Sequence, residues 1–182
     1  IIPHHVLRHT SCTASIMTRP EANLDMVRLG IGLYGLWPSA DVKRLSEILL
    51  QPALAWKTKI IEVQKLSKGT VVGYGKSFIT KKPTVMASIP VGYWEGYDRR
   101  LGNRGFVIVR GARCPRIGRI CMNLSMVDIS KVKNTKVGDE VILIGKQGSE
   151  EVSADDLANT INTINYEVVT RINPQLPRIL VK

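Results

Sequence analysis

Apolar and polar positions alternate along much of the second part of the chain. Residues 53–66 show this alternation, which is typical of an antiparallel strand with one solvent-facing side. Short apolar runs bounded by turn residues predict further strands at 85–90, 106–109, 115–120, 125–129, 141–144 and 177–181. Residues 47–182 are therefore expected to form a mainly β domain.

The first part of the chain has a different pattern. Residues 26–37 are an apolar run interrupted by three glycines, as expected for a buried parallel strand that leads into a glycine-rich loop. Ser39 then predicts the start of a helix. The apolar face of this helix would consist of Val42, Leu45, Ile48 and Leu49. We interpret residues 1–46 as the tail of an α/β unit.

Two helices are predicted near the end of the chain. Ser153 and Asp156 have the spacing of a capping box, which marks a helix start. The apolar positions of that helix would be Leu157, Ile161 and Ile164. A shorter helix over 166–172 would end before Pro174.

Composition narrows the class of protein. The chain has 182 residues, of which 44% are hydrophobic and 23% charged, as in globular proteins and unlike disordered ones. No apolar run approaches the roughly 20 residues of a membrane-spanning helix, so no membrane insertion is expected. The cysteines and histidines have no metal-binding spacing: Cys12, Cys114, Cys121, His4, His5 and His9. We expect no bound metal, no disulfide framework and a reducing compartment.

The net charge and two short motifs suggest functions that the sequence does not support. The chain carries a formal charge of +11, but the charges are dispersed and only 5% of residues are aromatic, so nucleic-acid binding is not expected. Residues 75–77, Gly-Lys-Ser, resemble the end of a phosphate-binding P-loop, yet Thr70 stands where its first glycine is required. Residues 70–75 resemble a potassium-filter loop, but no spanning helices accompany them.

Eight short motifs occur in an order that carries more information than any one of them. They are HTSCT (9–13), VRLGI (27–31) with LYG (33–35), GYG (73–75), PVGY (90–93) with Gly96, GRICM (118–122), GDEV (138–141), NYE (165–167) and PRI (177–179). With these motifs the chain resembles the alanine racemases, which are pyridoxal phosphate (PLP) enzymes with an N-terminal (β/α)8 barrel and a C-terminal β domain. The resemblance runs from His9 to the end of the chain.

The resemblance implies a separate role for each of the two parts of the chain. Residues 1–46 would be the last strands and helix of the PLP-binding barrel, and 47–182 the C-terminal β domain that carries the catalytic tyrosine. Barrels of this kind bind phosphate in the loops after strands 7 and 8, where backbone N–H groups face the anion. The phosphate of PLP would be held by Thr13, Gly30, Ile31 and Tyr166. A tight turn alone would also explain the glycine.

Arg28 is implied to face the pyridine nitrogen of PLP. An arginine does not give up its proton, so the ring nitrogen would stay largely unprotonated and the cofactor would be a weaker electron sink. Return of the proton to Cα would then be favoured over transamination. His9 is implied to lie behind Arg28 in a supporting network. The alternative is a surface arginine held in a salt bridge.

Tyr74 is implied to be the catalytic base for the L face of the substrate. Racemisation needs one base on each side of Cα, and in alanine racemases a lysine serves the D face while a tyrosine from the partner subunit serves the L face. A phenol has a pKa of about 10, so it needs cationic or hydrogen-bonding neighbours to act as a base. Without the resemblance, Tyr74 would be interpreted as a strand aromatic packed on a turn.

Substrate binding is implied for Tyr93 and Met122. Tyr93 would narrow the mouth of the site together with Tyr166, in a way that fits alanine, and the backbone N–H of Met122 would bind the substrate carboxylate. Three departures from the usual family pattern leave the tuning of the pocket open. They are Cys12-Thr13 in place of Asn-Ser, Trp94-Glu95 in place of Ala/Gly-Asp, and Asn123 in place of Asp.

The function implied is interconversion of L- and D-alanine by a cytoplasmic homodimer, supplying D-alanine for peptidoglycan. The chain begins at Ile1 without an initiator Met, so we expect a piece of a longer protein. The lysine that anchors the cofactor would lie before Ile1, and this chain alone is expected to be inactive. Two alternatives are a serine racemase of the same fold and a non-catalytic basic β domain that binds a polyanion.

Overall fold

The structure is a computed structural model, and it describes residues 6–181. By its internal contacts the chain divides into two compact units, Ile1–Leu54 and Ala55–Lys182, later than the predicted boundary after residue 46. The expectations for Ile1, His4 and His5 lie outside the described residues. In the part of the chain that is described, no helix is long and apolar enough to cross a bilayer.

The first unit consists of short helices. They are α1 (Thr13–Thr18), the 3₁₀ helices η1 (Pro20–Ala22) and η2 (Ile31–Tyr34), and α2 (Ala40–Leu45). The strand predicted over 26–37 is wrong, because only Arg28 pairs, in a single parallel bridge with Cys12. After Gly30 the backbone turns into η2, since the amide of Leu33 donates to the carbonyl of Gly30 at 2.9 Å instead of to a neighbouring strand.

Helix α2 begins as predicted and ends early. The Oγ of Ser39 accepts a hydrogen bond from the amide of Val42 at 3.2 Å, which is the expected N-cap. The predicted extension to residue 49 is wrong. Ser46 has an extended backbone, and its hydroxyl accepts from the amide of Ile48, which takes that amide away from the helix. Leu49 is 93% exposed.

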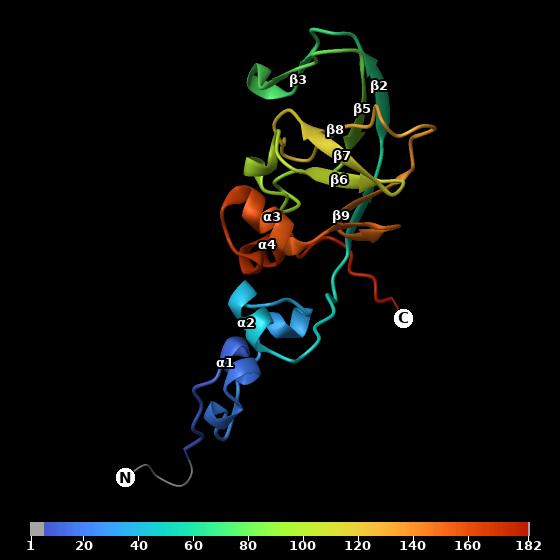
Figure 1. Cartoon of the computed structure of the whole chain (residues 1–182). Coiled ribbons are helices and arrows are strands. Elements are labelled where there is room, and N and C mark those ends of the chain that lie inside the picture. Colours follow the sequence, from blue (N-terminus) through green and yellow to red (C-terminus); the bar gives the residue numbers. More distant parts are fainter. Residues whose placement is uncertain (1–5, 182) are drawn as a thin grey trace. The chain divides into compact units, whose positions relative to one another are not determined.

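The second unit is built on one antiparallel sheet (Figure 1). The strands lie in the order β1 (Trp56–Lys59), β9 (Glu140–Gln147), β6 (Phe106–Val109), β7 (Ala112–Ile117), β8 (Ser125–Asp128), β5 (Thr84–Ile89) and β2 (Glu62–Leu66), and β10 (Glu150–Val152) pairs with β9. Only two residues separate β1 from β2, although these strands end the two sides of the sheet. The sheet must therefore curl so that its ends approach each other.

The single strand predicted over 53–66 is in fact two strands that pair with different partners. The amide of Ile60 donates to the carbonyl of Asp139 at 2.9 Å, next to β9. The amide of Ile61 donates to the carbonyl of Ser88 at 2.9 Å, on β5. The adjacent apolar residues Ile60 and Ile61 interrupt the alternation at this change of partner, a signal that the prediction of one strand overlooked.

The core lies around the central strands. The residues with no exposed area include Val107, Ile108 and Val109 on β6, Val141, Ile142 and Leu143 on β9, and Ala87, Ile89 and Val127 on β5 and β8. Continuous apolar runs of this kind are expected where both faces of a sheet are covered. The fold is mainly β with few helices, as predicted.

Two helices complete the second unit. Helix α3 (Ala154–Ile161) has both bonds of the capping box: the amide of Asp156 donates to Ser153 Oγ at 3.0 Å, and the amide of Ser153 donates to Asp156 Oδ2 at 2.8 Å. Ile164 does not belong to it, because Asn162 ends the helix in a left-handed conformation. Ile164 instead precedes α4 (Asn165–Arg171) and is 58% exposed.

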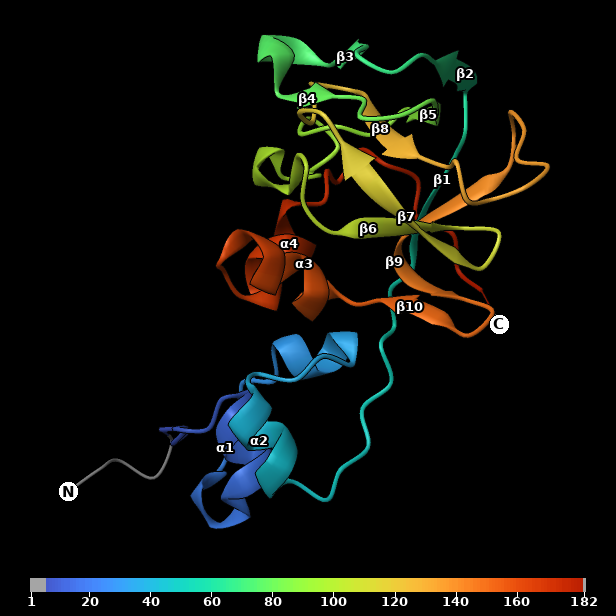
Figure 2. The ribbon, with the colours of Figure 1, turned by 45° about the horizontal axis from the view of Figure 1, so that its top comes forward.

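Two strand predictions need correction. Strand β7 ends at Ile117, before the predicted residue 120, because the amide of Gly118 donates to the Asn103 side chain at 2.6 Å and leaves the ladder. Residues 177–181 form no strand, and Leu180 is fully exposed. The sequence did not predict β10 or the short hairpin of β3 (Val71–Val72) and β4 (Phe78–Ile79) (Figure 2).

Candidate functional site

Tyr74 lies at the tip of the β3–β4 hairpin. It opens the 3₁₀ turn η3 (Tyr74–Lys76) and is 72% exposed. Gly73 has φ of 73°, and a side chain there would also come within 3.1 Å of Met126. Both constraints require glycine at this position. The local sequence thus forces a tight turn that holds the phenol on the surface, away from the sheet core.

The Tyr74 turn borders a cleft of about 410 Å³. Its lining residues are Tyr74, Tyr93, Arg99, Arg119, Ile120, Cys121, Met122, Asn123 and Leu124. Three predicted site residues, Tyr74, Tyr93 and Met122, are therefore brought together although they are far apart in sequence. Tyr93 is 44% exposed and Met122 is 54% exposed, so both side chains are accessible from the cleft.

The cleft is positively charged. Arg99 and Arg119 are its two charged lining residues, and the sequence did not single out either of them. A side chain at Gly75 would fall 2.9 Å from Nη1 of Arg119, so this guanidinium lies directly against the Tyr74 turn. Such a site attracts an anionic group such as a carboxylate. Arg119 is part of the motif GRICM, but no local pattern distinguishes it from other surface arginines.

The segments that carry Tyr93 and Met122 are joined through their backbones. The amide of Tyr93 donates to the carbonyl of Cys121 at 3.0 Å, and the amide of Trp94 donates to the carbonyl of Met122 at 2.9 Å. The position of one segment therefore fixes the other. This explains why two loop residues can form one wall of a cleft.

In the first unit, the residues predicted to bind phosphate lie together. The amide of Gly30 donates to Thr13 Oγ1 at 2.9 Å, and the Thr13 side chain is buried. The amides of Ile31 and Gly32 precede the first hydrogen-bonded amide of η2, that of Leu33. A hydroxyl with a proton to donate and two amides at a helix start are suitable partners for a phosphate. These residues fit the phosphate of PLP.

Arg28 and His9 are in contact in the same unit. Nη1 of Arg28 lies against Nδ1 of His9, and Nη2 donates to the carbonyl of Thr10 at 3.2 Å. Arg28 is exposed. The predicted pairing of the two side chains is therefore observed, whereas the group that Arg28 would face is not part of the chain.

Tyr166 lies at the start of α4 and is half-buried. It is not among the residues that line the cleft of Tyr74. The end of α4 is nevertheless tied to the Tyr93 segment, because Arg171 pairs with Asp98 at 3.0 Å and the Asn173 amide donates to the carbonyl of Glu95 at 3.1 Å. The same contacts therefore hold both the end of helix α4 and the segment that forms the cleft wall.

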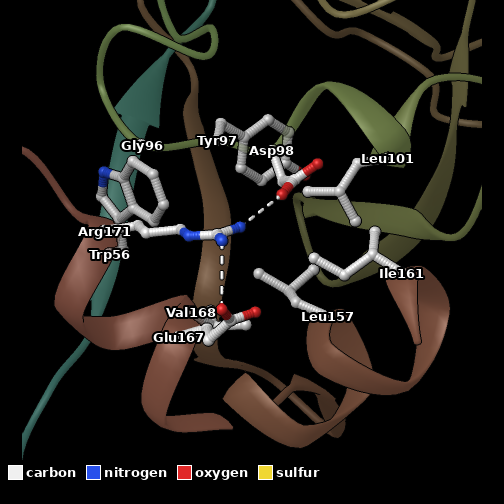
Figure 3. A pocket seen from close by; sticks show the side chains of 10 residues that line it. All are labelled: Trp56, Gly96, Tyr97, Asp98, Leu101, Leu157, Ile161, Glu167, Val168 and Arg171. Atoms are coloured by element: carbon white, nitrogen blue, oxygen red, sulfur yellow. Dashed lines mark hydrogen bonds and ion pairs between the residues drawn. The ribbon is translucent and has the colours of Figure 1, made fainter. Parts of the chain in front are cut away.

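Asp98 and Arg171 line a small gap, shown in Figure 3. The gap has a volume of about 10 Å³, which is enough for one water molecule and too small for a substrate. Arg171 bridges Asp98 and Glu167 across it. A hydrogen bond from Arg100 holds the pKa of Asp98 below its usual range, so this carboxylate stays charged. We interpret the residues around this gap as a structural link between α4 and the segment that carries Tyr93.

Tyr97 also lines this gap, and its side chain is fully buried. Burial raises the pKa of its phenol, and the nearby Arg116 guanidinium partly opposes the shift. Its hydroxyl contacts Arg116, and its ring packs edge-on against Trp56 at 5.6 Å between centroids. A phenol held in this way is suited to packing.

Comparison with known proteins identifies the family. The model of the alanine racemase C-terminal domain matches residues 53–180, which covers the sheet, the Tyr74 hairpin and both C-terminal helices. The chain belongs to the alanine racemase family. Alanine racemases of Desulfosudis oleivorans and Leptospira interrogans are 47% and 46% identical to it, over 95% and 98% of this chain. The match covers 44% and 47% of those proteins, so the chain spans about half the length of these relatives.

Solved alanine racemases have the same fold. The enzyme of Bacillus anthracis, solved with bound L-Ala-P, superposes with a TM-score of 0.91 at 34% identity over 97% of this chain and 45% of that one. The enzyme of Bartonella henselae, solved with covalently bound pyridoxal phosphate, has a TM-score of 0.83 at 28% identity over 94% of this chain and 46% of that one. The resemblance deduced from the eight motifs is therefore confirmed at the level of the family.

Proposed function

We propose that this chain is the C-terminal part of a PLP-dependent alanine racemase that interconverts L- and D-alanine. Family membership supports the reaction class, and the chain's share of its relatives' length supports its being one part of the enzyme. The observation that carries the proposal is the exposed Tyr74 beside Tyr93 and Met122 in one cationic cleft.

In this proposal each cleft residue has a distinct task. The phenol of Tyr74 takes a proton from Cα of L-alanine, or returns one to that face. The backbone N–H of Met122 binds the substrate carboxylate, and Tyr93 narrows the site so that a small side chain fits. Arg99 and Arg119 would draw the carboxylate toward the cleft, since two cations without a carboxylate among the lining residues attract an anion.

Most residues proposed to hold the cofactor belong to the first unit. Thr13, Gly30 and Ile31 would form the phosphate site, in which the Gly30 amide holds the Thr13 hydroxyl and the Ile31 amide faces the anion, with Tyr166 of the second unit as a further ligand. Arg28, supported by His9, would face the pyridine nitrogen. PLP, when bound, supplies an electron sink for the charge left on Cα. The contact between Gly30 and Thr13 supports the assignment of the phosphate site. The contact between Arg28 and His9 supports the assignment of Arg28 to the pyridine nitrogen.

We further propose a homodimer in which Tyr74 serves the active site of the partner subunit. A side chain that works in another subunit has to be accessible on the surface, and the 72% exposure of Tyr74 is consistent with that. D-alanine formed by the dimer would supply peptidoglycan synthesis in the cytoplasm.

The variant Tyr74→Phe tests the proposal in the full-length racemase with PLP. Loss of one base should slow racemisation by about 10²- to 10⁴-fold. In D2O, exchange of the α-proton of D-alanine should persist without inversion, because the lysine on the D face remains, whereas exchange from L-alanine should stop. Tyr34→Phe, at a tyrosine that does not line the cleft, is the matched control. Equal racemisation by Tyr74→Phe and wild type would refute the role of Tyr74.

The chain alone provides a second test. With PLP but without an N-terminal barrel segment it should not racemise alanine, and addition of a separately made barrel segment should restore activity. Turnover by the pure chain would contradict the proposal. Parallel assays with serine would distinguish an alanine racemase from a serine racemase of the same fold.

A second candidate function is binding of a polyanion. Next to the cleft lies a recess of about 380 Å³ that contains Arg99, Arg100, Arg104 and Arg119. If the recess binds polyanions, the affinity for heparin or RNA should fall steeply between low and physiological salt. Retention of racemase activity with no such binding would favour the first proposal.

A further inference from the structure

Glu95 is a buried carboxylate that lies directly behind the cleft wall. It is 7% exposed, and it is not among the residues that line the cleft. Its Oε2 accepts a hydrogen bond from the amide of Gly92 at 2.7 Å, and its Oε1 accepts one from Nδ2 of Asn123 at 3.1 Å. Gly92 and Asn123 are the direct neighbours of Tyr93 and Met122. The two oxygens of one carboxylate thus hold the two segments that carry proposed substrate-binding residues.

The close approach of these segments depends on Gly92. A side chain at Gly92 would fall 2.2 Å from the carbonyl oxygen of Cys121 and 2.3 Å from that of Met122. The two backbones therefore run in contact, and the amide of Gly92 is buried between them. A buried amide without a partner is costly, so the carboxylate is needed where it is.

Glu95 also connects this wall to helix α4. Its backbone carbonyl accepts from the amide of Asn173 at 3.1 Å, and the side chain of Asn173 donates to the carbonyl of Trp94 at 3.1 Å. Asn173 follows α4, which carries Tyr166. Glu95 therefore contacts all three segments that carry Tyr93, Met122 and Tyr166.

We propose that Glu95, paired with Asn123, is a positioning residue that sets the geometry of the substrate-binding wall. Because an ionised carboxylate only accepts hydrogen bonds, Asn123 must present its NH2 group to it. The pair is thus an acceptor on the loop 92–95 and a donor on the segment 121–123. This inference rests on the proposed function for its effect on substrate binding, but the pairing itself does not.

The chemistry of the pair allows a rescue experiment. In this chain, where the longer Glu95 stands in place of the usual Asp, the change Asn123→Asp would set two carboxylates against each other, which repels the segments or forces them to share a proton. In the double variant E95Q/N123D, the new amide would donate to the new carboxylate while its oxygen still accepts from Gly92. E95Q alone should have a small effect, since Asn123 can turn its amide over and offer its oxygen. E95A should be the most damaging change, because it leaves the Gly92 amide unpaired.

Kinetics of the full-length racemase give one readout. We expect N123D to raise KM for alanine about tenfold with a smaller change in kcat, and E95Q/N123D to return KM to within about twofold of wild type. E95Q should stay within about threefold. The control Asp156→Ala, outside the cleft, removes one of the two hydrogen bonds of the α3 capping box and should lower Tm without changing KM.

Amide NMR spectra of the 182-residue chain give a readout that does not depend on activity. The Gly92 amide proton should move upfield in N123D and E95A and return in E95Q/N123D, together with the amides of Tyr93 and Met122. If the double variant is no better than N123D in both readouts, the pairing is wrong. If E95A lowers Tm as Asp156→Ala does but leaves KM unchanged, Glu95 is only structural and the inference fails. A wild-type racemase without activity would refute the proposed function, while the spectra would still decide the pairing.

Discussion

The two units of the chain differ in how their backbone groups are hydrogen-bonded and in how far their apolar side chains are buried. In Ala55–Lys182 the strands of one curled sheet satisfy each other's hydrogen bonds, and the apolar residues 107–109 of β6 and 141–143 of β9 have no exposed area. In the described part of Ile1–Leu54, α1 and α2 have six residues each, which is below the length at which isolated helices are stable. Apolar side chains there remain exposed, with Leu33 at 68% and Leu49 at 93%.

This difference separates the candidate site into two kinds of residue. Tyr74, Tyr93 and Met122 belong to the unit with its own core, and backbone hydrogen bonds and Glu95 hold the last two in register. Thr13, Gly30 and Arg28 belong to the unit that leaves apolar surface uncovered. We therefore expect the cleft wall to be the more rigid of the two groups of residues, and the proposed cofactor residues to be held less firmly.

Hydrogen exchange should give the largest contrast between the units. The most protected amides of β6 and β9 should exchange only on global unfolding, at least about a thousandfold more slowly than the amides of Arg28 and Leu33, which need only local opening. Mass spectrometry or NMR of the chain in D2O measures both sets at once. Equal protection in the two units would show that the first unit is independently stable and would break the comparison.

Core truncations should show the next largest contrast. Leu143→Ala removes a fully buried side chain from β9 and should lower the free energy of unfolding by about 3 kcal/mol. Leu49→Ala makes the same chemical change at a side chain that is 93% exposed, and it should change that free energy by less than about 0.5 kcal/mol. Urea titrations followed by tryptophan fluorescence compare the two. A loss above about 1 kcal/mol for Leu49→Ala would mean that the first unit buries this residue.

The sequence predicted the fold best where local pattern and tertiary pairing agree. Strand β6 lies at the predicted positions, because an apolar run between turns is buried on both faces in the sheet. The capping box of α3 is local and was confirmed in full. Residues 26–37 and 177–181 have strand-like composition but lack a neighbouring strand among the described residues, and composition alone cannot supply a partner.

The candidate site was predictable only through the order of the motifs. Tyr74, Tyr93 and Met122 were named from the resemblance, and the structure places them around one cleft. Arg99 and Arg119 were missed because two exposed arginines in a chain of charge +11 have no distinguishing local pattern. Glu95 and Asn123 stood out only as separate departures from the usual pattern, since their hydrogen bond joins residues far apart in sequence.

Thiol labelling should separate the units by about a hundredfold or more. Burial raises the pKa of the Cys114 thiol to about 11, with Asp128 adding to the shift, whereas hydrogen bonds from the amides of Ser15 and Ala14 lower the pKa of exposed Cys12. At pH 8 iodoacetamide should therefore modify Cys12 first, as peptide mass spectrometry would show. The neutral Cys114 thiol contributes stability that is complete below about pH 9 and is lost as the pH rises toward 11. Faster labelling of Cys114 would contradict its burial.

The smallest contrast is expected from one motif that occurs in both units. Ser153 caps α3 and Ser39 caps α2, and each hydroxyl accepts a hydrogen bond from a backbone amide three residues on. Because Leu157 of α3 is buried and lines the small gap together with Trp56 of β1, Ser153→Ala should lower the free energy of unfolding of the main transition by about 1 kcal/mol. Ser39→Ala should leave that transition unchanged, since α2 belongs to the other unit and none of its own residues is buried. Equal shifts in a urea titration would mean that the two units unfold together.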